Sequence, residues 1–151
     1  MPSDTIGELR ARLALENGAH ATDAQLDELE RLVGAPLPSM FRAFMSTVGA
    51  NRMWNLRFGR DDVIFAEVHE MIVNVETMDI VGAGLVPFGD DLLADQWILK
   101  CNPKDPGRGG AVVFVPTQPC YIDPEEPVEP MADSFEAFLL GLVKRPDDYW
   151  D

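Results

Sequence analysis

Residues 22–34 read TDAQLDELERLVG, residues 35–38 read APLP, and residues 39–49 read SMFRAFMSTVG. Thr22 and Gln25 form a capping-box pair at the start of a helix, and Gly34 provides its left-handed end. Pro36 prevents this helix from continuing, whereas Pro38 suits the first turn of a second helix, where its missing N–H costs nothing. The stretch therefore predicts a helical hairpin. Its apolar stripes are Leu26, Leu29, Leu32 and Val33 in the first helix, and Phe41, Phe44, Met45 and Val48 in the second.

Further helices are predicted on both sides of this hairpin. Residues 4–15 have Ile6, Leu9 and Leu13 on one face, which predicts an N-terminal helix. The pattern in residues 67–75 fits a helix better than a strand, because its apolar residues recur every three or four positions. A closing helix begins near Asp133 or Ser134 and ends at Pro146. Its expected buried side chains are Phe135, Phe138, Leu139, Leu142 and Val143.

Short apolar runs between these helices predict strands at 63–65, 96–100 and 111–115. The connector at 102–110 is rich in turn residues, which is typical of a hairpin loop. The five prolines from Pro116 to Pro130 inclusive allow at most a short edge strand near residues 120–122. Helices, then strands, then a helix indicate an α+β fold, in which an antiparallel or mixed sheet packs against N-terminal helices and a C-terminal helix.

The order of residues in the hairpin resembles the signature of the SUKH (Smi/Knr-like) superfamily. Segments 85–91 (LVPFGDD), 111–115 (AVVFV) and 133–139 (DSFEAFL) resemble its strand-entry segment, central strand and closing helix. The resemblance extends over roughly residues 22–145. It implies a SUKH-like fold and, because bacterial members are often immunity proteins against secreted toxins, a protein-binding function. The chain departs from the family at Leu92-Leu93-Ala94, where a glycine-rich turn is usual.

Length and composition favour one domain over residues 1–151, with a core at about 4–145 and a short acidic and aromatic tail at 146–151. The sequence has no run of about 20 apolar residues and no signal-peptide pattern after Met1, so we expect a cytoplasmic protein. Cys101 and Cys120 lack metal-site spacing and are expected to be reduced thiols.

The net charge of −14 is distributed unevenly along the chain. Residues 1–60 hold seven acids and seven arginines, whereas residues 61–151 hold 19 acids and five bases. Such a surface repels nucleic-acid phosphates and anionic membranes, and it attracts cationic proteins. The alternative is that the acidity only keeps the protein soluble.

Residues suited to catalysis are few in this sequence. His20 and His69 are the only histidines, and no nucleophile motif accompanies them. Neither histidine forms a standard zinc spacing with the cysteines. We therefore expect no enzymatic activity, no metal and no cofactor.

Two acidic turns remain as the candidate partner-binding surface. Close carboxylates can hold a divalent metal, but more often they form a solvated loop or a negatively charged rim. We expect a rim that contacts a basic toxin domain, with Trp97 as an aromatic anchor. The candidate contact residues are Asp90, Asp91, Asp95, Trp97, Glu125, Glu126 and Glu129.

Three functions fit these observations. The first is an immunity protein that neutralises a cognate toxin by covering its active cleft; a toxin that acts on nucleic acid is one such target. The second is a regulatory scaffold that binds several proteins without a toxin partner. The third is an enzyme that uses the acidic turn with a divalent metal, which would be recognised by thermal stabilisation with Mg²⁺, Mn²⁺ or Ca²⁺.

Overall fold

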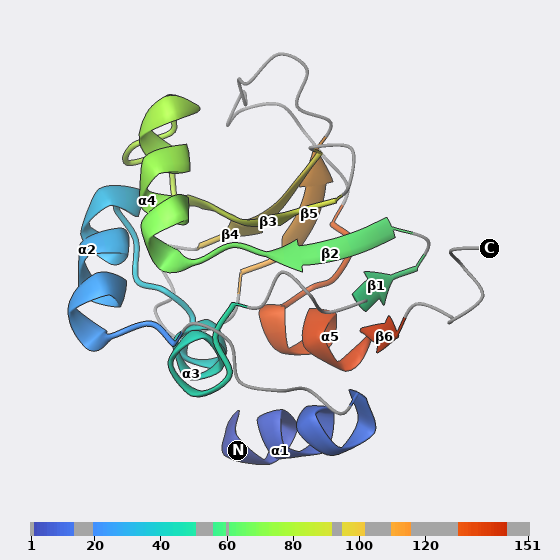
Figure 1. The fold of residues 1–151 in the computed structure, drawn as a ribbon. Helices are drawn as coiled ribbons and strands as arrows, with labels where there is room; N and C mark the ends of the chain where they lie inside the picture. The colour runs from blue at the N-terminus through green and yellow to red at the C-terminus, as the bar shows by residue number, and fades with distance from the viewer. Residues whose placement is uncertain are drawn as a thin grey trace.

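The computed structural model describes residues 2–13, 20–50, 56–59, 61–91, 95–101, 110–115 and 130–144. Within these segments three helices precede the sheet, a fourth lies between its strands, and a fifth precedes the last strand (Figure 1). In chain order the elements are α1 (Pro2–Leu13), α2 (Asp23–Val33), α3 (Ser39–Thr47), β1 (Leu56–Phe58), β2 (Asp61–Phe65), α4 (Val68–Thr77), β3 (Leu85–Asp90), β4 (Gln96–Lys100), β5 (Val112–Val115), α5 (Phe135–Leu140) and β6 (Val143–Lys144).

The predicted helical hairpin is confirmed in its local detail. Thr22 and Gln25 form the capping box of α2, and Gly34 closes that helix with a φ of 82°. Pro38 occupies the N-cap of α3, one position before the predicted first turn. The Glu30 carboxylate accepts a hydrogen bond of 2.8 Å from the N–H of Leu37, which fixes the corner between the two helices.

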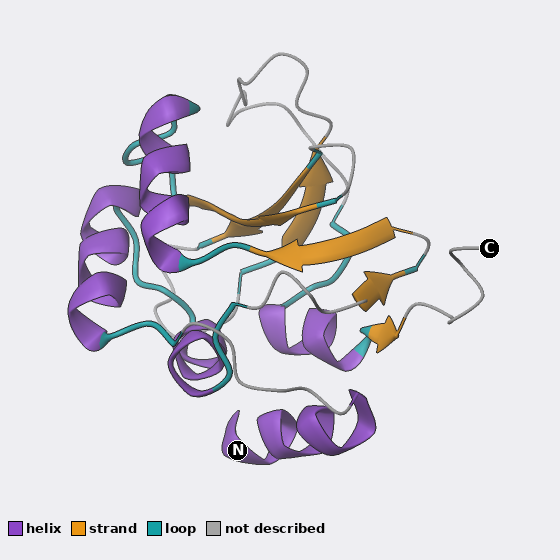
Figure 2. Ribbon diagram, in the orientation of Figure 1, coloured by secondary structure: helices purple, strands orange, loops and turns teal. Residues whose placement is uncertain are grey.

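The sheet is antiparallel and curled, with the strand order β5-β4-β3-β2-β1-β6. α2 packs against α4, α4 packs against β3, and α3 packs against α5. α1 lies beneath α3 and α5 and packs against both (Figure 2). The α+β architecture predicted from the sequence is therefore confirmed.

An aromatic cluster joins the helices to the sheet. The ring of Phe135 on α5 lies 5.2 Å from that of Phe41 on α3 and 5.4 Å from that of Phe88 on β3. Phe138 lies 5.2 Å from Trp97 on β4. All five of these residues are fully buried, so the predicted stripes of α3 and α5 meet the sheet in one core.

The closing helix is shorter than predicted. α5 ends at Leu140, and Val143, which was expected to be buried, is 45% exposed in β6. The reason is Gly141, where a Cβ atom would lie 2.6 Å from the ring of Phe58 on β1. The chain turns at this glycine and pairs with β1, so that Val143 lies opposite Arg57. The three-residue strand β1 was not predicted, because it is too short to show an alternating pattern.

Several sequence predictions concern segments that the structure does not describe. The possible edge strand at 120–122, most of the connector at 102–110 and the tail at 146–151 lie outside the described residues. The pairing of β4 with β5 nevertheless agrees with an antiparallel hairpin across that connector.

Candidate protein-binding surface

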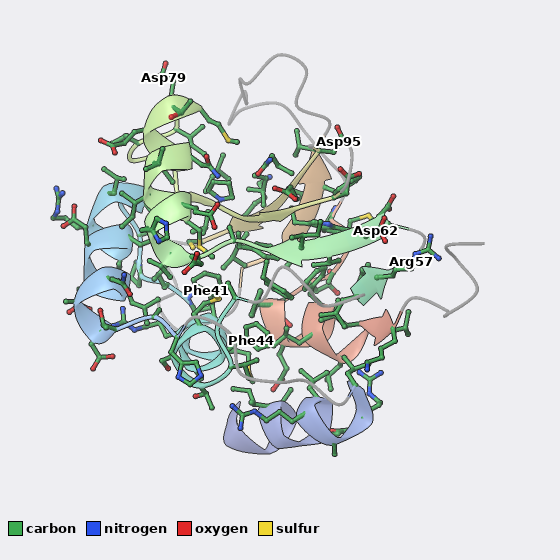
Figure 3. The ribbon with its side chains drawn as sticks, viewed as in Figure 1. Phe41, Phe44, Arg57, Asp62, Asp79 and Asp95 are labelled. Atoms are coloured by element: carbon green, nitrogen blue, oxygen red, sulfur yellow. The ribbon has the colours of Figure 1, made fainter. Side chains whose placement is uncertain are left out.

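Five aspartates lie at one end of the sheet. Asp61 and Asp62 begin β2, Asp90 ends β3, Asp91 follows it, and Asp95 precedes β4. Because the three strands are antiparallel neighbours, the start of β2, the end of β3 and the start of β4 lie side by side. We call these five residues the acidic edge. Figure 3 shows Asp62 and Asp95 at this end of the sheet, together with Arg57.

The turn between β3 and β4 is held by its own aspartates. The N–H of Asp95 donates a hydrogen bond of 2.9 Å to Oδ1 of Asp91. The N–H of Asp91 donates one of 3.1 Å to the main-chain oxygen of Asp95. This pair of hydrogen bonds holds the main chain of Asp95 against Asp91, and both residues are partly exposed to solvent.

Asp62 connects the acidic edge to the core. Only 8% of the residue is exposed, and its Oδ1 lies 3.6 Å from Nε of Arg57 on β1. Its main-chain oxygen accepts a hydrogen bond of 2.9 Å from Nε1 of the buried Trp97. These interactions fix the beginning of β2, so that the neighbouring Asp61 is held near the turn of β3 and β4.

The pKa of Asp61 shows that this arrangement disfavours the charged form of its carboxyl. Burial raises the pKa of its carboxyl, and the charges of other carboxylates raise that pKa further. In order of effect these carboxylates are Asp91, Asp62 and Asp95, and Arg57 opposes them. The like charges are therefore close enough to repel one another. A cationic group placed against this edge would relieve the repulsion.

The predicted contact residues have three different outcomes. The structure places Asp90, Asp91 and Asp95 at the acidic edge, and all three are partly exposed. Trp97 is 0% exposed, so the expectation that it anchors a partner at the surface is wrong. Its strand is buried on both faces, since Ile98 is also buried. The remaining candidates lie outside the described residues. They are Glu125, Glu126 and Glu129.

Asp61, Asp62 and Arg57 were missed as candidates from the sequence. A signal for the aspartates was present, because both directly precede the apolar strand run at 63–65. What the sequence did not reveal is that β2 lies beside β3, which brings these two residues to the Asp90–Asp91 turn.

Other chemistry is poorly supported in the described part of the chain. His20 and His69 are exposed, and no group of three or more His, Cys, Asp or Glu residues there could hold a metal ion. Cys101 is a buried free thiol, and burial raises its pKa to about 12, so it is not an activated nucleophile. None of the helices in these segments has the length and apolar character needed to cross a bilayer.

Comparison with known proteins places the fold in a family. The sequence profile of the SMI1 / KNR4 family (SUKH-1) matches residues 20–141, which include α2 through α5 and five strands of the sheet. No curated protein sequence matches the chain significantly. Because the family match covers most of the 151 residues, this protein belongs to the SMI1 / KNR4 family (SUKH-1).

Proposed function

We propose that this protein is a non-enzymatic immunity protein that binds a basic toxin domain and neutralises it by occlusion. Two observations support the proposal. The SUKH family includes immunity-type proteins and is not a recognised enzyme family. Aspartates at the ends of three strands lie within one partly exposed region, and the pKa of Asp61 is raised first by burial and then by the charges of Asp91, Asp62 and Asp95. The second observation carries the choice of surface.

The acidic edge is suited to capture a cationic partner. The main chain that carries its carboxylates is held by strand pairing and by the Asp91–Asp95 hydrogen bonds, so little ordering of the main chain is needed when a partner arrives. A basic surface would be steered toward this edge, and charge-assisted hydrogen bonds to its carboxylates would hold it there. Occlusion of an active cleft needs an interface of about 1,200–2,000 Å², so the edge would form part of a larger contact area.

The proposed contact residues are Asp61, Asp90, Asp91 and Asp95. Asp62 acts behind them, because it is buried and paired with Arg57. Glu125, Glu126 and Glu129 remain proposed contacts on the charge of their segment alone. In a complex, lysine or arginine side chains of the toxin would lower the pKa of Asp61 again, so binding would weaken as the pH falls through the raised pKa.

The test uses the C-terminal domain of any large secreted protein encoded beside this one. Co-expression should rescue growth of cells that produce this domain, and calorimetry should detect a complex of the two purified proteins. We expect Asp61→Lys with Asp95→Lys to reduce the association rate about tenfold or more at 50 mM salt, with a much smaller reduction at 500 mM. This pair leaves the Oδ1 acceptor of Asp91 in place.

A matched control reverses two exposed acids on helices, Glu8→Lys and Glu76→Lys, and changes the net charge equally. If no neighbouring domain is bound or neutralised, the immunity function is wrong, and the regulatory scaffold becomes the better explanation. If a domain is bound but the two variant pairs weaken binding equally, the function stands and the acidic edge is not the contact surface.

A further inference from the structure

Helix α1 lies outside the part of the chain that matches the family. The match begins at residue 20, whereas α1 ends at Leu13. The helix packs against α3 and α5 and buries Ile6, Leu9 and Leu13 on that side. In Figure 1 it lies beneath both helices, on the side away from the sheet. α1 thus covers an apolar surface that the family fold itself provides.

Two arginines attach α1 to the ends of the helices that it covers. Nη2 of Arg10 donates a hydrogen bond of 2.6 Å to the oxygen of Thr47, the last residue of α3. Arg12 donates bonds of 3.1 Å and 2.8 Å to the oxygens of Leu140, the last residue of α5, and Leu142. The last carbonyls of a helix lack partners within it and lie at the negative end of its dipole, so guanidinium groups suit them.

These contacts define the kind of helix that the α3/α5 surface binds. Its floor is apolar, and carbonyl acceptors lie at the ends of two helices. The helix that fits it carries apolar residues spaced as Ile6, Leu9 and Leu13, with two arginines in its last turn at the spacing of Arg10 and Arg12. At the other end of α1, Oγ1 of Thr5 donates a hydrogen bond of 2.9 Å to the carboxylate of Glu136.

The helix that occupies this surface, α1, is only marginally stable in isolation. α1 is 12 residues long, a length at which an isolated helix is marginal in water. Gly7 lies in its interior, although a Cβ atom there would meet nothing within 4 Å. Alanine would therefore fit at this position and would favour the helix by a factor of roughly five. Glycine at this site makes α1 easier to melt without serving the packing.

We infer that α1 is an exchangeable ligand of the α3/α5 surface, which can leave while the rest of the fold persists. The vacated surface then binds the α1 helix of a second copy of this chain, through the same apolar residues and the same arginine pair. This inference goes beyond the proposed function and does not depend on a toxin.

The first test measures amide hydrogen exchange in the full-length wild-type protein. We expect the α1 amides to exchange ahead of those in α3 and α5, because they open locally. Gly7→Ala should slow exchange in α1 roughly fivefold without altering α3. Arg10→Gln with Arg12→Gln should speed it, whereas Arg31→Gln, which removes an exposed arginine on α2, should leave α1 unchanged. Exchange of α1, α3 and α5 at one common rate in the wild-type protein would overturn the inference.

The second test adds a labelled peptide of residues 2–13 to the full-length chain. We expect the peptide to bind the Arg10→Gln/Arg12→Gln protein at least tenfold more tightly than the wild-type protein. In the wild-type protein α1 competes in cis at an effective concentration on the order of millimolar. A peptide in which both arginines are glutamine should bind at least tenfold more weakly. The surface does not exchange its helix if about 1 mM peptide binds to neither protein. The same conclusion follows if the peptides with arginine and with glutamine bind equally tightly.

Discussion

Asp61 illustrates how a single residue records the electrostatics of the acidic edge. Its carboxyl is partly buried and faces the charges of Asp91, Asp62 and Asp95, so its pKa is raised above the ordinary value of 3.8. A carboxyl whose pKa is higher in the folded than in the unfolded state binds its proton more tightly when folded. The stability of the fold therefore decreases as the pH rises from about 3.8 through the raised pKa, and the loss is complete above it.

Removing the charge of Asp61 should accordingly stabilise the protein at neutral pH. We expect Asp61→Asn to raise the free energy of unfolding at pH 7 by about 0.2–1 kcal/mol, the range of partly exposed charge interactions, and to have no such effect near pH 3. Urea unfolding at both pH values measures this difference. Glu28→Gln is the opposite case, because the hydrogen bond from Arg31 lowers the pKa of Glu28. Glu28→Gln should leave the free energy of unfolding at pH 7 unchanged or slightly lower. Equal effects of Asp61→Asn at both pH values would contradict the electrostatic explanation.

The C-terminal end of α2 depends on the loop that precedes β3. Its carbonyls at Leu32 and Val33 accept hydrogen bonds of 2.9 Å and 3.0 Å from the N–H groups of Gly82 and Gly84. Gly34, with a positive φ, ends the helix so close to this loop that a Cβ atom would lie 3.0 Å from Cα of Gly82. Three glycines thus hold the end of α2 against the loop that leads into β3.

This junction predicts a difference between two Gly→Ala substitutions. Gly59 also has a positive φ, but a Cβ atom there would meet nothing within 4 Å. We expect Gly59→Ala to cost about 1–2 kcal/mol of unfolding free energy, from the left-handed conformation alone. Gly34→Ala should cost clearly more, because it adds contact with the main chain of Gly82. Chemical denaturation of both variants gives the comparison. Equal losses would show that the loop adjusts to the added methyl group.

At the scale of the whole molecule, the net charge of −14 acts against the compact state. The arginines and acids of residues 1–60 balance, whereas residues 61–151 carry the excess, and part of that excess is concentrated at the acidic edge. Mobile ions screen such repulsion over distances of about 10 Å at 0.1 M salt. Stability should therefore respond to ionic strength.

Thermal unfolding at increasing NaCl concentration tests this response. Between about 20 and 500 mM we expect the Tm to rise by roughly 2–4 °C, which corresponds to about 1 kcal/mol for a chain of this size. The Asp61→Lys/Asp95→Lys variant should show a smaller rise than the Glu8→Lys/Glu76→Lys control, although both carry the same net charge. A Tm that is constant or falls with salt would mean that favourable ion pairs outweigh the repulsion.

The sequence alone determined the elements whose rules are local. Thr22, Gln25 and Gly34 specify the limits of α2 through hydrogen bonds and backbone angles within a few residues. The apolar spacing of α3 and α4 and the runs at 96–100 and 111–115 likewise contain their own periodicity, and all were predicted correctly. The ordered resemblance of these pieces was sufficient to indicate the family.

The tertiary structure alone decided what depends on which strands become neighbours. Pairing of β1 with β6 converts Val143 from an expected core residue into an exposed edge residue. Burial of both faces of β4 turns Trp97 from an expected surface anchor into a core residue that supports Asp62. Proximity of β2 to β3 brings Asp61 to the acidic edge. Strand pairing joins residues far apart in the chain, and the free energy of such contacts depends on the whole fold, so no short stretch of sequence encodes it.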